Sequence, residues 1–369
     1  MRRVDPTVLI LIVGAAILAV LPEFGLKTYQ VEAMTRFLIF SIAAMGLNLT
    51  LGYAGQISLA QAAFLGIGAY TTALMTKAGL PWIAAFGAAG LICFFVGVIL
   101  GFPALKVQHH YLAFVTLAFG TLMWLVARNE QWLTGGVFGI SGIPRPGLFD
   151  FKLTRAADFH RFVVVVTLVL ALVAWWLIRS PWGRAFQALR ENPLRAASLG
   201  VNIRNYTLLA FAIGSAYGGF AGSLYAPLSR FIDHSPFDLG HSLEILLMVI
   251  SGGSGYFFGP FLGAILAVVL PELLRFTGGL YLILYAVFVM VLLIFSPTGI
   301  FGFIDRLTTT RKTKAETVET PVPEVIVKTG STDRHQLILE ESDDEPLIPS
   351  PGRRPRTYRD LDEIPDDLD

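Results

Sequence analysis

The sequence predicts an all-α polytopic membrane protein with about ten transmembrane helices, a polar helix-turn-helix between them and a disordered C-terminal tail. Of its 369 residues, 54% are hydrophobic and 15% are charged, whereas charged residues make up about 25% of an average soluble domain. The apolar residues come in runs close to the ~20 residues that a helix needs to cross a bilayer. The single cysteine, Cys93, lies inside such a run, which excludes a disulfide framework.

The expected spans follow one another as ten apolar runs. The first comes after Arg2 and Arg3, and we interpret it as a membrane helix rather than a signal peptide because Leu21-Pro22-Glu23 stands where a cleavage site would be. The runs are Val8–Leu21, Phe37–Tyr53, Ile57–Thr76, Trp82–Leu100, Tyr111–Ala127, Phe162–Ile178, Thr207–Leu228, Leu243–Ser251, Phe257–Leu270 and Leu280–Phe295. The eighth run is too short to span alone, which predicts a broken or tilted helix.

A polar interval, Pro181–Tyr206, separates the sixth run from the seventh. Its charged residues are four arginines and one acid: Arg184, Arg190, Arg195, Arg204 and Glu191. In its first half, Trp182, Phe186 and Leu189 recur at helical spacing, which predicts a first amphipathic helix.

The second half of this interval has the residues of a short capped helix. Asn192 can cap its start, Pro193 fits the first turn where no N–H is needed, and Gly200 can end it in the left-handed conformation. The simpler interpretation is a loop whose arginines only keep it in the cytoplasm. A tether needs no capped helices, so we favour an element that docks on another protein.

Orientation follows from the gathering of Lys and Arg in short cytoplasmic loops. With ten spans and Pro181–Tyr206 in the cytoplasm, both termini lie inside, together with the Lys106–His110 turn and the Arg306–Lys314 cluster. Three basic residues fall outside, in a long loop where the rule is weak: Lys152, Arg155 and Arg161.

A block without Lys, Arg, Asp or Glu runs between Phe37 and Thr76 and contains a polar patch. Glycines at 52 and 55 let the backbone leave helical geometry there, and the uncharged polar side chains nearby are Asn48, Gln56, Ser58 and Gln61. A helix beginning near Ile57 would place Ser58 and Gln61 on one face. Inside a bilayer such a break survives only when buried in protein or lining a water-filled path.

A similar glycine patch, Ser251–Gly263, falls in the second half of the chain and contains Gly252, Gly253 and Gly255. The two patches indicate a weak internal repeat. They favour a path for a neutral or zwitterionic solute over the alternative, in which small and amide residues only hold helices together.

Ionisable residues in the expected spans are few, and no enzyme site is recognisable. Glu244 begins the eighth run with His241 three residues before it, which favours an interfacial pair over a proton relay. The glycine-rich segment Thr134–Pro144 lacks the phosphate-binding pattern of a P-loop, and no such pattern occurs elsewhere. The sequence therefore predicts neither catalysis nor a cofactor bound by this chain.

Five segments together resemble the permease subunits of branched-chain amino acid ABC importers of the LivM type. They are Gly52–Tyr70, Thr134–Pro144, Ala188–Tyr206, Ala216–Tyr225 and Gly252–Gly263. The resemblance covers roughly residues 35 to 302 in the right order. There are two departures: Ile250-Ser251-Gly252 stands where the family usually has Ile-Gly-Gly, and the tail beyond Phe303 has no counterpart.

The resemblance implies an importer driven by ATP in a bacterial inner membrane. This chain would pair with a second permease of the LivH type, with two cytoplasmic ATPase subunits that bind ATP and Mg²⁺, and with an outer substrate-binding protein. Nucleic acid has no place in that assembly. The implied ATPase-coupling residues are Arg184, Arg190, Glu191, Asn192, Pro193, Arg195, Ala196 and Gly200.

Alternatives remain for the substrate and for the mechanism. Close relatives of this family import urea and short amides, so branched-chain amino acids are one of two substrate classes. A stand-alone secondary transporter or channel would be expected to have buried acids at mid-membrane, which are scarce here. A membrane scaffold with a signalling tail would leave the paired glycine patches unexplained.

The composition changes beyond Asp305. Residues 1–304 are predicted to form the transmembrane permease domain, and 305–369 an acidic cytoplasmic tail without Phe or Trp. Such a segment buries too little apolar surface to offset the entropy lost on ordering, which predicts disorder.

Overall fold

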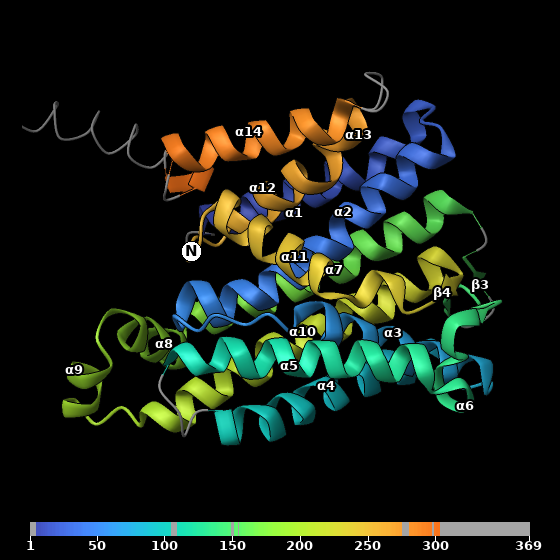
Figure 1. The fold of residues 1–369 in the computed structure, drawn as a ribbon. Helices are drawn as coiled ribbons and strands as arrows, with labels where there is room; N and C mark the ends of the chain where they lie inside the picture. Colours follow the sequence, from blue (N-terminus) through green and yellow to red (C-terminus); the bar gives the residue numbers. More distant parts are fainter. Residues whose placement is uncertain are drawn as a thin grey trace, which may run out of the picture. The chain divides into compact units, whose positions relative to one another are not determined.

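A computed structural model describes residues 5–104, 109–148, 151–153, 155–274, 280–296 and 299–302. They belong to one compact unit, Met1–Glu316, and they are almost entirely helical (Figure 1). The all-α fold is therefore confirmed. The Lys106–His110 turn lies mostly outside the described residues, and the boundary at residue 304 and the tail lie wholly outside them.

Each expected run contains a helix. The long helices are α1 Pro6–Val20, α2 Thr28–Leu47, α3 Gln61–Lys77, α4 Trp82–Ala104, α5 His109–Asn129, α7 Ala156–Arg179, α10 Ile203–Ser229, α11 Leu239–Gly252 and α14 Tyr281–Phe295. Shorter ones are α6 Gln131–Thr134, α8 Pro181–Glu191, α9 Pro193–Ser198, α12 Gly259–Ala264 and α13 Leu270–Leu274. A π-helix, Asn48–Tyr53, continues α2, and another, Ile265–Val269, joins α12 to α13.

Six helices in the described part of the chain are long and apolar enough to cross a membrane, judged by length and composition. They are α1, α2 with its π-helix, α4, α5, α7 and α10. α3 has 17 residues, and α11, α12–α13 and α14 are also shorter apolar helices. The number of ten spans therefore remains a prediction.

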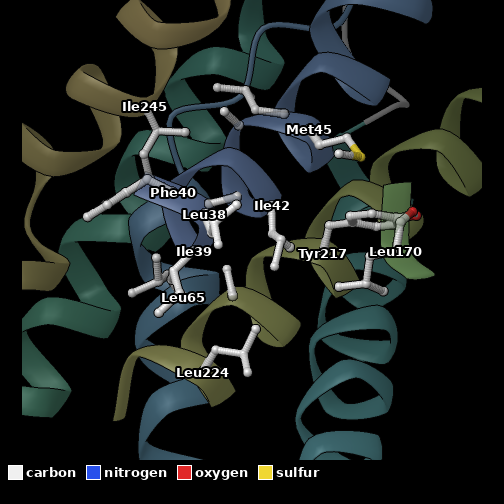
Figure 2. Close-up of a cluster of buried hydrophobic side chains, with 14 of the residues drawn as sticks. Leu38, Ile39, Phe40, Ile42, Met45, Leu65, Leu170, Tyr217, Leu224 and Ile245 are labelled. Atoms are coloured by element: carbon white, nitrogen blue, oxygen red, sulfur yellow. The ribbon is translucent and has the colours of Figure 1, made fainter. Parts of the chain in front are cut away.

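The core forms around α10, which packs against α2, α3 and α4. A Cβ atom at Gly68 of α3 would run into the Gly219 carbonyl of α10, so these two helices touch through their backbones. Figure 2 shows a cluster of buried apolar side chains in the core, among them Ile42 and Leu224, both fully buried. The Tyr217 hydroxyl, also buried, donates a hydrogen bond of 2.9 Å to the Leu170 carbonyl of α7.

Two ion pairs identify the ends of the bundle. Arg179, at the end of α7 just before α8, pairs with Asp5 beside α1, so the start of α1 lies at the same end as α8 (Figure 1). Arg161, near the start of α7, pairs with Glu23 at 2.5 Å and marks the opposite end. Which side of the membrane each end faces remains a prediction.

The end marked by Arg161 also carries a small antiparallel sheet. Strand β1, Ile140–Ser141, pairs with β4, Phe231–Ile232, which follows α10 directly. This pairing fixes the glycine-rich segment after α6 to the end of α10. A second antiparallel pair is formed by β2, Gly147–Leu148, and β3, Phe151–Lys152.

Two local predictions were wrong. The third helix begins at Gln61 rather than near Ile57, so Ser58 and Gln61 do not share a helix face. The cause is the turn before it: the Gln56 N–H donates to the Thr50 carbonyl at 2.9 Å, and Gly55 has a φ of +71°. His241 does not pair with Glu244; its Nδ1 lies 2.9 Å from Oδ1 of Asp238, which also caps α11.

Candidate functional site

The two glycine patches, more than two hundred residues apart in sequence, are in direct contact. The Nδ2 of Asn48 donates to the Tyr256 carbonyl at 3.0 Å. The Gly255 N–H donates to Oδ1 of Asn48 at 2.9 Å. Asn48 is 2% exposed, so both bonds are shielded from water. We call the group Asn48, Gly52, Gly255 and Tyr256 the glycine junction.

The junction exists because the backbone is unusual on both of its sides. Asn48 opens the π-helix that ends α2, and a Cβ atom at Gly52 would lie 2.5 Å from the Gly255 nitrogen. Gly255 has a φ of +87°, a conformation that L side chains rarely adopt. Only glycine fits the close approach at both positions.

The polar interval reaches this junction through Arg190. In the last turn of α8, Nη1 of Arg190 donates to the Gly52 carbonyl. A Cβ atom at Gly255 would collide with the same guanidinium, and one at Gly55 would lie 3.3 Å from Cγ of Arg190. One side chain therefore contacts both glycine patches and links them mechanically to α8.

The predicted helix-turn-helix is present, with the predicted caps. The Asn192 side chain accepts from the Arg195 N–H at 3.0 Å, and Pro193 is the first residue of α9. Gly200 follows α9 with a φ of +86°, the left-handed value expected there. Sequence reasoning missed the cap of α8, in which Ser180 accepts from the Trp182 and Gly183 N–H groups.

One face of α8 anchors the pair to the bundle. Phe186 is 1% exposed and packs edge-to-face on Tyr206 at 6.5 Å between ring centroids, and Leu189 is also buried. Trp182 differs from the prediction because it is 45% exposed, at the start of the helix where α8 leaves α7. In α9 only Ala196 is buried.

The outer surface of α9 presents apolar side chains to the surroundings. Leu194 is 82% and Leu199 is 84% exposed. Arg195 is exposed beside them, and Arg184 and Glu191 are exposed on α8. Large apolar side chains flanked by arginine are typical of protein interfaces. The sequence contained a signal for this surface, because Leu194 lies on α9 and Leu199 directly follows it. A helix this short cannot form an apolar core by itself.

Two of the remaining polar residues of the first patch, Gln61 and Gln56, donate hydrogen bonds to other helices. Gln61 is buried, and its Nε2 donates to the Ala43 carbonyl of α2 at 2.9 Å and the Gly214 carbonyl of α10 at 3.3 Å. The Gln56 Nε2 donates to the Thr207 carbonyl at 3.1 Å. Its Oε1 is buried without a hydrogen-bond partner among the described residues. Ser58 accepts a 3.4 Å bond from the Ala60 N–H.

The structure brings some predicted path residues together and separates others. Asn48 and Gly255 meet in the junction, whereas Gln61 lies between α2 and α10. Gly252 packs closely against Gly259 of α12, and Gly253 ends α11 with a φ of +120°.

Comparison with known proteins identifies similar transport proteins. Residues 29–299 match the family described as "branched-chain amino acid transport system / permease component". The high-affinity branched-chain amino acid transport system permease protein LivM of Escherichia coli K12 is 34% identical over 78% of this chain and 74% of that protein. The autoinducer 2 import system permease protein LsrC of Yersinia pestis is 26% identical over 71% of this chain and 77% of that protein. No solved structure matches the chain.

Proposed function

The chain belongs to the branched-chain amino acid transport permease family, and on this premise we propose that it is a membrane subunit of an ATP-driven importer. Its cargo is leucine, isoleucine and valine. ATP is hydrolysed by two cytoplasmic ATPase subunits, so this chain is not itself an enzyme. A second permease pairs with it in a bacterial inner membrane, and an outer binding protein delivers the amino acid.

The observation that carries this proposal is the attachment of α8–α9 to the glycine junction. Leu194 and Leu199 offer an apolar surface for a partner, and the flanking arginines favour an acidic rim on that partner. Movement of the ATPase displaces α8, and Arg190 carries this displacement to Gly52 and Gly255. We propose that α8–α9 and both chain termini face the cytoplasm, which the distribution of Lys and Arg supports.

The glycine junction is also the part of the path that we propose opens and closes. The π-helix at the end of α2 and the break after α11 offer two backbone segments with alternative geometries. Their carbonyls and the free Oε1 of Gln56 offer uncharged polar contacts to a zwitterion. The proposed path residues remain Asn48, Gln56, Ser58, Gln61, Gly252, Gly253 and Gly255.

Uptake by cells that lack this subunit tests the proposed cargo. Complementation with the full chain restores accumulation of labelled leucine. Excess isoleucine or valine suppresses this accumulation, and loss of the partner ATPase abolishes it. Labelled urea and autoinducer 2 are offered in parallel. Urea is the alternative substrate class, and autoinducer 2 is the cargo in the name of the LsrC relative. Restored urea or autoinducer uptake without leucine uptake contradicts the amino-acid cargo, and uptake independent of the ATPase contradicts the importer mechanism.

A further inference from the structure

A polar cavity of about 420 Å³ lies between α2, α10, α11 and α13. Its lining includes Arg36, Phe40, Tyr225, His241, Glu244 and Glu272. Tyr225 stands one turn before the end of α10, where β4 follows, and His241 lies in the first turn of α11. The cavity therefore lies toward the end of the bundle opposite α8, away from the glycine junction.

Charges of both signs border this cavity from different helices. Arg36 of α2 is exposed, and Glu244 of α11 is half-buried. Within the described part of the chain no ion pair joins these two side chains. His241 is held by Asp238 at 2.9 Å. Glu272 adds a second carboxyl group from α13.

A guanidinium and a carboxylate that line one cavity without forming an ion pair with each other are complementary to a zwitterion. The guanidinium fork binds a carboxylate through two parallel hydrogen bonds. The carboxylate of Glu244 accepts hydrogen bonds from an ammonium group. A pair that only joined α2 to α11 would be in contact, as Arg161 and Glu23 are at 2.5 Å.

The same cavity has an apolar wall. The rings of Phe40 and Tyr225 meet edge-to-face with 6.4 Å between centroids, and Ala267 and Val268 extend the wall. Sites for small molecules commonly have volumes of about 300–1,000 Å³ and combine apolar walls with a few polar anchors. The volume of about 420 Å³ falls in the lower part of that range.

We propose that this cavity is a binding site for a free α-amino acid with an apolar side chain. Arg36 binds the carboxylate, Glu244 binds the ammonium group, and Phe40 with Tyr225 contacts the side chain. The inference rests on the proposed function, because it specifies where this permease first holds its cargo. A neutral amide such as urea would use neither charge.

Direct binding to the full chain in lipid nanodiscs tests the site without any ATPase or binding protein. Labelled leucine is the probe, and 3-methylbutylamine and 4-methylpentanoate compete as analogues that lack the carboxylate or the ammonium group. Arg36→Gln and Glu244→Gln each weaken leucine binding about ten- to a hundredfold, as expected for a lost charge-assisted hydrogen bond. Arg36→Lys retains part of the affinity because it keeps the positive charge.

The analogues separate a ligand contact from a structural role. Arg36→Gln removes the preference for leucine over 3-methylbutylamine but keeps the preference for leucine over 4-methylpentanoate. Glu244→Gln removes the second preference and keeps the first. Arg161→Gln, at the same end but in a closed ion pair, is the control and leaves leucine binding unchanged. Two results would overturn the site and leave the proposed function standing. One is leucine uptake by cells although the purified chain binds no leucine, and the other is binding by the variants equal to that of the parent chain. Loss of leucine uptake in the parent chain contradicts the proposed function itself.

Discussion

The two ends of the helix bundle hold their arginine side chains in different ways. At the α8 end, Arg190 donates to a backbone carbonyl of the glycine junction, and Arg195 stands exposed among uncovered leucines. At the opposite end, Arg161 forms an ion pair with Glu23, whereas Arg36 and Glu244 line one cavity and form no ion pair with each other among the described residues. The surroundings of each guanidinium therefore match its proposed role. Arg190 and Arg195 belong to the proposed coupling and docking element, Arg161 joins two helices, and Arg36 is proposed to bind a ligand.

The largest effect is expected at the glycine junction, where the α8 end meets the path. Gly255→Val adds a side chain at a φ of +87° and drives it into the Arg190 guanidinium. The left-handed backbone alone costs about 1–2 kcal/mol for such a residue. The collision with Arg190 should disrupt the contact between α8 and the glycine junction. We therefore expect leucine uptake per assembled protein to fall by more than about tenfold, which corresponds to about 1.4 kcal/mol.

Gly142→Val is the matched control for this change. Gly142 lies in the loop before β2, at the opposite end of the bundle, with a φ of +75° and no atom within 4 Å of its added Cβ. It carries the same backbone strain without the collision. Equal loss of uptake in both variants would show that strain alone is responsible and that the contact with Arg190 transmits nothing.

The exposed leucines give the next largest effect and test docking at the α8 end. Leu194→Asp with Leu199→Asp replaces two side chains that are more than four-fifths exposed, so the unfolding temperature of the chain should barely change. Association with the partner ATPase should fall at least about tenfold, which corresponds to about 1.4 kcal/mol, because two carboxylates replace the apolar contact and would meet the acidic rim proposed on the partner. Co-purification of the tagged complex measures it, and full recovery of the ATPase would contradict the docking surface.

A smaller effect is expected between the two ends, at Gln61. Gln61→Leu removes the hydrogen bonds to the Ala43 and Gly214 carbonyls and should cost about 1–3 kcal/mol of stability. The thermal midpoint in detergent should fall. Because Gln61 is also a proposed path residue, uptake per assembled protein should fall several-fold. A lower midpoint with unchanged uptake per assembled protein would mean that Gln61 only joins helices.

Local sequence patterns predict some features of this structure and not others. The caps at Asn192 and Gly200 were predictable because capping depends on residues within one turn. The contact between Asn48 and Gly255 was not, because no local rule joins residues so far apart in sequence. The start of α3 was misplaced because the hydrogen bond from Gln56 to Thr50 breaks an apolar pattern that continues through the turn. The role proposed for Arg36 was not predictable either, because only the fold brings it to the same cavity as Glu244.

The smallest expected effect separates the shape of α9 from its surface. Asn192→Gly with Pro193→Gly removes the side-chain cap and the preset first turn while Leu194 and Leu199 stay in place. Replacing an N-cap residue by glycine costs roughly a few tenths of a kcal/mol of stability, and replacing the proline adds about 0.4–1 kcal/mol. ATP hydrolysis stimulated by substrate should fall by a few-fold, while membrane insertion and leucine binding at the distant cavity persist. Normal stimulation would mean that the leucine surface docks without an ordered α9, and coupling would then depend on α8 and Arg190 alone.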